Sequence, residues 1–304
     1  MQKEIETYYE IMQDLWLNQD VSGLCKYFFD IDITLGQEKI IRCVAFAESK
    51  RTVICCMTRY GKSFSVSLGI LLWILQNQNK KIVIIAPTNE KTTIIRNYIA
   101  LFVSKSHIFS KLIDLEKTGI ERIRKEVSKR RMTWKNGIEM RTLSAEGQGT
   151  QLMGFGADLC VVDEECDIDF DVYRSKITRM LGDSLDSAYI GIGNPWHRDN
   201  QMWQHWIDPF WHKIRIDWRQ AVAEGRVSQE FVDEQKSILT DMEFEILYEV
   251  NFPLTAADAL IDWNWIDSAQ NTNWDFGGEV IAGLDVAEMG VDFTVLTVAV
   301  KDAQ

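Results

Sequence analysis

The residues best suited to chemistry form a short motif between an apolar run and an amphipathic stretch. The motif comprises Met57, Thr58, Arg59, Tyr60, Gly61, Lys62 and Ser63. A Gly-Lys-Ser turn between a strand and a helix is the centre of a phosphate-binding loop, where backbone N–H groups and the helix N-terminus hold phosphate oxygens. Lys62 would place its charge on the β- and γ-phosphates of ATP, and Ser63 would offer its hydroxyl to Mg²⁺. Cys56 stands where such loops usually carry their first glycine.

Two acidic residues end another apolar run about 100 residues later in the chain. Residues 159–162 are followed directly by Asp163 and Glu164. Asp163 would hold the Mg²⁺ through water, and Glu164 would orient and deprotonate an attacking water. The alternative interpretation is a strand followed by a solvated acidic loop over residues 165–171. A catalytic Glu164 would indicate hydrolysis and not mere nucleotide storage.

Two amides have types and positions that suit the same site. Gln37 lies about 25 residues before Lys62, and its side chain could both accept from and donate to the adenine edge of ATP. Its alternative is an exposed loop glutamine. Asn194 ends a further apolar run in the sequence Gly-Asn-Pro, where its amide could sense the γ-phosphate. The alternative there is a turn that merely closes a strand.

Short apolar runs predict the elements that position these residues. They cover residues 53–57, 82–86, 159–162 and 188–192, and their continuous apolar character is typical of strands buried on both faces of a parallel sheet. Predicted helices over 63–76 and 90–103 separate the first of them. This alternation indicates an α/β fold with a central, mostly parallel sheet flanked by helices.

The remaining segments differ from these in charge, glycine content and predicted secondary structure. Residues 117–135 hold eight basic and two acidic side chains, Asn136-Gly137 is a hairpin signal, and the glycine-rich residues 147–156 predict a loop. After residue 210 the chain is Trp-rich and predicted to be helical. Residues 280–285 and 293–300 predict a hairpin that opens another domain. We expect a core over 1–210, a helical lid or linker over 211–276, and the start of a second domain over 277–304.

Composition narrows the classes of protein. The 304 residues carry a net charge of −12, which excludes a basic sheath for coating nucleic acid but permits a local DNA-binding patch. The six cysteines form no CxxC pair and show no ligand spacing with the four histidines, so we expect buried thiols and no zinc site. No apolar run approaches the roughly 18 residues that span a bilayer, and the acidic N-terminus is unlike a signal peptide. A membrane partner is not expected.

Taken together, these motifs resemble the large terminase of tailed bacteriophages, the motor that packages DNA into a capsid. Residues 59–64 resemble the family's variant phosphate loop, 161–164 its Walker B strand and catalytic glutamate, and 193–195 its coupling motif. Residues 244–249 with Phe252 resemble its segment between ATPase and nuclease. Residues 281–285, continuing to Gly290, Asp292 and Thr294, resemble the first strands of its RNase H-like nuclease.

The resemblance implies a P-loop ATPase that uses ATP and Mg²⁺ to translocate double-stranded DNA into a procapsid. It implies a homo-oligomeric ring on a portal protein, a small terminase subunit as partner, and a place in the cytoplasm of an infected bacterial host. A helicase-like DNA-remodelling ATPase and a nucleotide-dependent switch or scaffold are the alternatives.

Two residues or regions depart from the family's pattern. Asp285 would be the first metal-binding carboxylate of an Mg²⁺- or Mn²⁺-dependent nuclease, whose remaining acids would lie beyond residue 304, so we expect no DNA cleavage by this chain.

Many terminases carry an arginine finger before a glycine ahead of Walker B, where this chain has Met153-Gly154. We expect the catalytic cation to be Arg59 in cis, or to come in trans. The candidates for a trans finger are Arg130, Arg131 and Arg141. A solvated helix face or a DNA-facing patch is the alternative role of that basic stretch.

Overall fold

The computed structural model describes residues 2–113, 131–253, 268, 279–285 and 295–301. The chain divides into two units, residues 1–257 and 258–304, and each is described by itself. Among the described residues, no helix combines the length and apolar character needed to cross a membrane.

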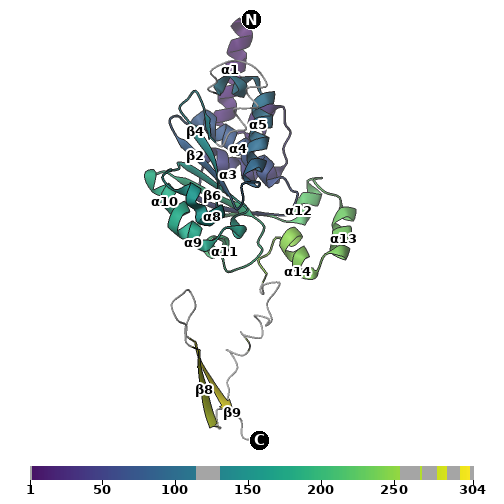
Figure 1. Cartoon of the computed structure of the whole chain (residues 1–304). Coiled ribbons are helices and arrows are strands. Elements are labelled where there is room, and N and C mark those ends of the chain that lie inside the picture. Colours follow the sequence, from purple (N-terminus) through teal and green to yellow (C-terminus); the bar gives the residue numbers. More distant parts are fainter. Residues whose placement is uncertain (1, 114–130, 254–267, 269–278, 286–294, 302–304) are drawn as a thin grey trace. The chain divides into compact units, whose positions relative to one another are not determined.

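A β-sheet forms the centre of the first unit (Figure 1). It has seven strands in the order β3-β4-β2-β5-β6-β1-β7. All neighbouring strands are parallel except β3 and β4. The strands are β1 (Arg51–Cys56), β2 (Lys81–Ala86), β3 (Arg131–Thr133), β4 (Glu139–Ser144), β5 (Leu159–Asp163), β6 (Ala188–Gly193) and β7 (His212–Ile216). The predicted α/β fold with a mostly parallel sheet is confirmed.

Helices cover both faces of this sheet. One face packs against α3 (Leu35–Phe46), α4 (Lys62–Gln76) and α5 (Thr92–Lys105), preceded by α1 (Gln2–Leu17) and α2 (Val21–Phe29) and followed by α6 (His107–Leu112). The other face packs against short helical turns between residues 146 and 183, which include α8 (Glu146–Gly149), α9 (Phe170–Val172) and α10 (Thr178–Met180). Alternate residues of β2 enter opposite cores, because Ile82 and Ile84 face α4 whereas Val83 and Ile85 face the other layer. Continuous apolar strands follow from this two-sided burial.

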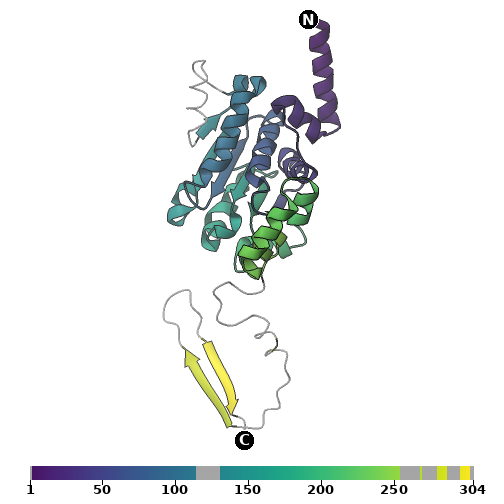
Figure 2. The same cartoon turned by 90° about the vertical axis from the view of Figure 1, so that its right-hand side faces the viewer.

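After β6 the chain forms α11 (Gln201–Ile207), then β7, then a group of helices seen in green in Figure 2. These are α12 (Trp218–Ala223), α13 (Gln229–Ile238), α14 (Asp241–Phe244) and the π-helical turn η5 (Glu245–Glu249). They pack against the same core cluster as α3 and α4.

The predicted hairpin at Asn136-Gly137 is confirmed by the antiparallel pairing of β3 and β4. Gly137 has a φ of +81°, a conformation that a side chain would strain, and Asn136 Nδ2 donates to the carbonyl oxygens of Ile74 and Asn77. The hairpin is therefore fastened to the end of α4. The basic residues 117–130 that precede it lie outside the described residues.

The prediction that residues after 210 are helical is wrong for residues 212–216. This segment is β7, which extends the sheet beside β1 beyond the expected core boundary at residue 210. Only Ile214 and Ile216 of β7 are buried, because it is an edge strand with one neighbour. Two apolar residues among charges give too short an alternation to predict a strand.

The second unit contains the predicted hairpin, formed by β8 (Glu279–Asp285) and β9 (Val295–Lys301) in antiparallel register. Asp285 ends β8 and pairs with Val295. Part of the expected helical lid or linker over 211–276, from residue 254 to 267 and from 269 onward, lies outside the described residues, as do residues 286–294.

Candidate nucleotide-binding site

The phosphate-loop motif forms the turn between β1 and α4, at the carboxyl edge of the parallel sheet. Gly61 precedes the first residue of α4 with a φ of +106°, which explains why this position is a glycine. Lys62 and Ser63 occupy the first turn of α4, where free backbone N–H groups attract anions. Cys56 is the buried last residue of β1, so the missing first glycine is replaced by an ordinary strand residue.

Lys62 joins the ends of three neighbouring strands. Its Nζ donates to Asn194 Oδ1 at 2.5 Å and lies 3.6 Å from Glu164 Oε1. Asn194 is buried after β6, and its Nδ2 donates to the Cys56 carbonyl oxygen at the end of β1. Three residues predicted from separate motifs are thus brought into contact by the parallel sheet.

Asp163 is the buried last residue of β5, and its Oδ1 has no hydrogen-bond partner in the described part of the chain. The pKa of its carboxyl is raised to about 7, chiefly by burial and also by the charge of Glu164, while Lys62 and Lys91 act in the opposite direction. An unsatisfied buried carboxylate oxygen beside a phosphate loop fits a cation ligand. The described residues contain no cluster of three acidic, histidine or cysteine side chains that could hold a metal ion by themselves.

Glu164 follows Asp163 in a left-handed backbone conformation, with a φ of +49°. About a quarter of its side chain is exposed, against a tenth for Lys62. The alternative of a fully solvated acidic loop does not fit, because the next residue, Glu165, is completely buried.

Gln37 lies beside the phosphate loop. It is the third residue of α3, where its Oε1 accepts from Thr34 N–H in a capping box, and only 2% of it is exposed. A Cβ atom on Gly61 would lie 3.3 Å from Gln37 Nε2. The alternative of an exposed loop glutamine is therefore wrong.

Tyr60 points away from the loop's phosphate side and into the protein. Its buried hydroxyl donates to Glu224 and contacts Thr34 Oγ1 at 2.9 Å, and burial raises its pKa. Thr58 N–H donates to the carbonyl oxygen of Leu247 in η5. Two of the loop residues thus contact the helices that follow β7. The sequence motif gave no sign of these contacts.

The candidate arginine fingers have different surroundings. Arg59 is exposed with a φ of +60°, and no hydrogen bond or ion pair joins it to another described residue. Arg131 and Arg141 both pair with Glu139, at 2.8 and 2.6 Å. Arg130 lies outside the described residues, and Met153 is 69% exposed.

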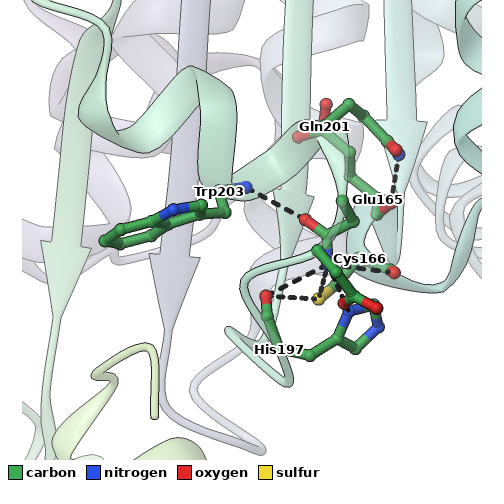
Figure 3. Close-up of polar contacts among 7 residues, drawn as sticks. Glu165, Cys166, His197, Gln201 and Trp203 are labelled. Carbon is green, nitrogen blue, oxygen red and sulfur yellow. Dashed lines mark hydrogen bonds and ion pairs between the residues drawn. The ribbon is translucent and has the colours of Figure 1, made fainter. Parts of the chain in front are cut away.

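A buried polar layer joins the loop after Glu164 to the loop after Asn194 (Figure 3). Gln201 Nε2 donates to the Glu165 carbonyl oxygen at 2.6 Å, and Asn200 Nδ2 donates to Cys166 Sγ at 2.8 Å. The Glu165 carboxylate accepts from the Tyr189 hydroxyl and contacts His205 Nδ1 at 2.8 Å. Sequence reasoning missed this layer, because its members come from three segments far apart in the chain, at residues 165–166, 189 and 200–205.

The same layer also caps the N-terminus of α11, through a hydrogen bond from the backbone of Trp203 that is drawn in Figure 3. The Asn200 side chain accepts from Trp203 N–H and thereby caps the helix. The same side chain thus starts one element and fixes the loop that carries the glutamate.

A mostly parallel seven-stranded sheet with Gly-Lys-Ser at the turn between β1 and α4 defines an α/β protein of the P-loop class. The chain belongs to the terminase large subunit family of the T4likevirus type, whose N-terminal model matches residues 58–281, more than half of the chain. No curated protein sequence matches the chain.

Solved structures of large terminases share this fold. The ATPase domain from Thermus phage P74-26 is 19% identical with a TM-score of 0.58, over 74% of this chain and 96% of that one. The large terminase of bacteriophage HK97 is 18% identical with a TM-score of 0.59, over 89% of this chain and 60% of that one. The ADP complex from thermophilic bacteriophage D6E is 11% identical with a TM-score of 0.54, over 73% of this chain and 54% of that one.

Proposed function

We propose that the first unit is an ATP-hydrolysing motor domain that moves viral double-stranded DNA into a procapsid. The observation that carries the proposal is the position of Lys62, held between Asn194 and Glu164 at the carboxyl edge of the sheet. Membership of the terminase family supports the packaging role, and the D6E structures with ADP and ATP-gamma-S support the nucleotide.

Nucleotide binding starts at the phosphate loop. The N–H groups of the first turn of α4 and the charge of Lys62 hold the β- and γ-phosphates. Ser63 and Asp163 are the residues that would hold Mg²⁺, which neutralises phosphate charge when bound. Gln37 reads the adenine edge beside Gly61.

Hydrolysis requires a base near the γ-phosphate. Glu164 is the acid closest to Lys62 in the described residues, so it orients and deprotonates the attacking water. When phosphates bind Lys62, they compete with the amide oxygen of Asn194. The loop after β6 therefore registers whether a γ-phosphate is present, which is the coupling role proposed for Asn194.

Assembly completes the proposed motor. A ring of subunits on the portal, with the small terminase subunit, would act on DNA in the cytoplasm of an infected bacterial host. Nuclease activity through Asp285 and Mg²⁺ or Mn²⁺ is proposed only for a chain that supplies further carboxylates.

The test compares ATP binding and hydrolysis in the parent, Lys62→Ala and Glu164→Gln proteins, with and without duplex DNA. Lys62→Ala should lose tight ATP binding. Glu164→Gln should bind ATP but hydrolyse it at least about 100-fold more slowly, as expected on loss of a general base. Turnover that is insensitive to duplex DNA, or normal turnover by Lys62→Ala, would contradict the proposal.

A further inference from the structure

The turn that ends α12 brings an arginine onto the phosphate loop. Arg226 Nη2 donates to the Tyr60 carbonyl oxygen at 3.2 Å and lies 3.4 Å from the position of a Cβ on Gly61. No ion pair joins Arg226 to a carboxylate among the described residues, and its side chain is exposed. A guanidinium without an anionic partner is therefore held at a loop built to bind anions.

Local structure fixes this position. Gly225, with a φ of +68°, ends α12, and the N–H groups of Gly225 and Arg226 bond back to Val222 and Ala221 carbonyl oxygens. Val227 then packs against the main core. The direction of the Arg226 backbone is thus set by a helix cap on one side and by packing on the other.

A polar junction holds the three contributing elements together. The Glu224 carboxylate accepts from Tyr60 O–H and from Gly36 N–H at 2.9 Å. A Cβ on Gly36 would lie 2.1 Å from the Tyr60 hydroxyl oxygen, so only glycine allows this approach. The start of α3, the phosphate loop and the end of α12 therefore meet at one point.

Gln37 and Arg226 flank Gly61 from this junction, at 3.3 and 3.4 Å from its Cβ position. Asn194 and Glu164, by contrast, contact Lys62 from the ends of β6 and β5. Arg226 consequently lies on the side of the loop where the adenine is proposed to bind, and not on the side proposed for the γ-phosphate.

We propose that Arg226 binds the nucleotide at its base, ribose and α-phosphate end, as a second cation supplied by the segment after β7. This inference rests on the proposed nucleotide site and extends it. Because ATP and ADP share that end, Arg226 contributes equally to both, and either nucleotide fastens α12 to the phosphate loop.

The test measures ATP and ADP affinity by calorimetry in a Glu164→Gln background, which prevents turnover. Arg226→Ala should weaken both affinities by about 10- to 100-fold, as expected for a lost hydrogen bond to a charged group. Arg226→Lys should lie between parent and alanine variants. The matched control is Arg219→Ala, which removes an exposed arginine of α12 that pairs with Asp217 and Glu249 and should change affinity less than twofold.

Hydrogen exchange supplies a second readout. ATP should slow amide exchange over residues 218–226 in the parent background and not in Arg226→Ala. An affinity loss below about twofold for Arg226→Ala, or a loss for ATP alone, would overturn the inference. If Lys62→Ala also binds ATP normally, the nucleotide site itself fails; if only Arg226→Ala does, this inference fails alone.

Discussion

Lys62, Glu164 and Asn194 were each predicted from a short motif, and the structure places their side chains in contact. Their residue types and their positions at strand ends were enough, because parallel strands end at a common edge. Arg226 and Glu224 could not be predicted, since they lie after an unrecognised strand and no local pattern marks an arginine that folds back onto a loop. The burial of Tyr60 was equally hidden within the motif.

The buried carboxyl of Asp163 predicts a pH-dependent stability. Its pKa is raised to about 7 in the folded chain, against about 4 when unfolded. Ionising this carboxyl is therefore less favourable in the folded chain than in the unfolded chain, so the free energy of unfolding falls as pH rises from about 4 to about 7. Without nucleotide or Mg²⁺, Asp163→Asn should stabilise the protein at pH 8, by on the order of 4 kcal/mol at most, and by less at pH 5. Urea unfolding at both pH values measures this.

Asp158 is the control with the opposite sign. Burial alone would raise its pKa, but hydrogen bonds from Lys80 and the Lys81 backbone lower it. Its ionised form therefore contributes stability above the unfolded pKa, and that contribution is lost as pH falls. Asp158→Asn should be less stable than the parent at pH 8. Equal stabilisation by Asp163→Asn at both pH values would contradict the assigned cause.

Gln37 should determine base preference. Its amide can accept and donate at the adenine edge, so Gln37→Ala should reduce the ATP-over-GTP affinity ratio by about 10-fold, the worth of one or two lost hydrogen bonds. Competition binding measures the ratio. Thr34→Ala is the control, because it removes the hydroxyl of the same capping box and keeps the amide. An unchanged ratio in Gln37→Ala, or an equal change in Thr34→Ala, would leave only the structural role.

At the scale of the elements, the turn that follows β5 lies against two glycines of β6. A Cβ on Gly191 would lie 1.9 Å from Glu165 Oε2, and one on Gly193 would lie 3.3 Å from the Glu165 backbone nitrogen. The glycines of β6 thus provide the room that Glu165, the residue after the proposed catalytic Glu164, occupies. The sequence contains Gly191-Ile192-Gly193, but the reason for the two glycines lies in the turn that follows β5.

Gly191→Ala should lower the free energy of unfolding by about 1–3 kcal/mol, the usual cost of overpacking a core. It should also slow ATP hydrolysis more than it weakens ATP binding, because Glu165 is displaced and Glu164 with it. Gly182→Ala is the control, since no atom lies within 4 Å of a Cβ there. Unchanged stability and turnover in Gly191→Ala would show that the buried layer does not position Glu164.

At the scale of the elements, the strands buried on both faces were predictable because their apolar runs are continuous. β7 was not, because an edge strand with two buried residues carries almost no pattern. The hairpin β8–β9 was predictable from its two β-branched runs. Short helical turns between residues 146 and 183 escaped prediction, since helices of three or four residues lack a period.

At the scale of the proposed ring, the prediction concerns which subunit supplies the arginine finger. Arg131 and Arg141 share Glu139 in the single chain, so either would have to leave that partner to reach a neighbour's nucleotide. We expect a finger in trans. Mixing Glu164→Gln subunits with Arg131→Ala or Arg141→Ala subunits should then restore activity, because mixed interfaces rebuild one complete site. A finger is worth roughly 10³- to 10⁵-fold in rate, so rescue is easily measured.

Arg59 provides the comparison in cis. If it is the finger, Arg59→Ala should be inactive alone and in every mixture, and activity per subunit should not depend on protein concentration. Rescue by Arg130→Ala, and by neither Arg131→Ala nor Arg141→Ala, would place the finger in the segment outside the described residues. Absence of rescue by all three would refute the trans assignment.

Arg215 of β7 has a mechanical consequence. Its guanidinium donates to the carbonyl oxygens of Glu249 and Val250 and to Asn251 Oδ1, just before residue 253. A pull on the chain beyond that point would first load the buried Phe252, whose carbonyl oxygen accepts from Arg198, and then Arg215 and β7, whose neighbour in the sheet is β1. Parallel hydrogen bonds between β7 and β1 would carry this tension in shear, directly to the strand that ends in the phosphate loop. β7, the strand that sequence patterns did not predict, thus connects residues 249–251 mechanically to the strand that ends in the phosphate loop.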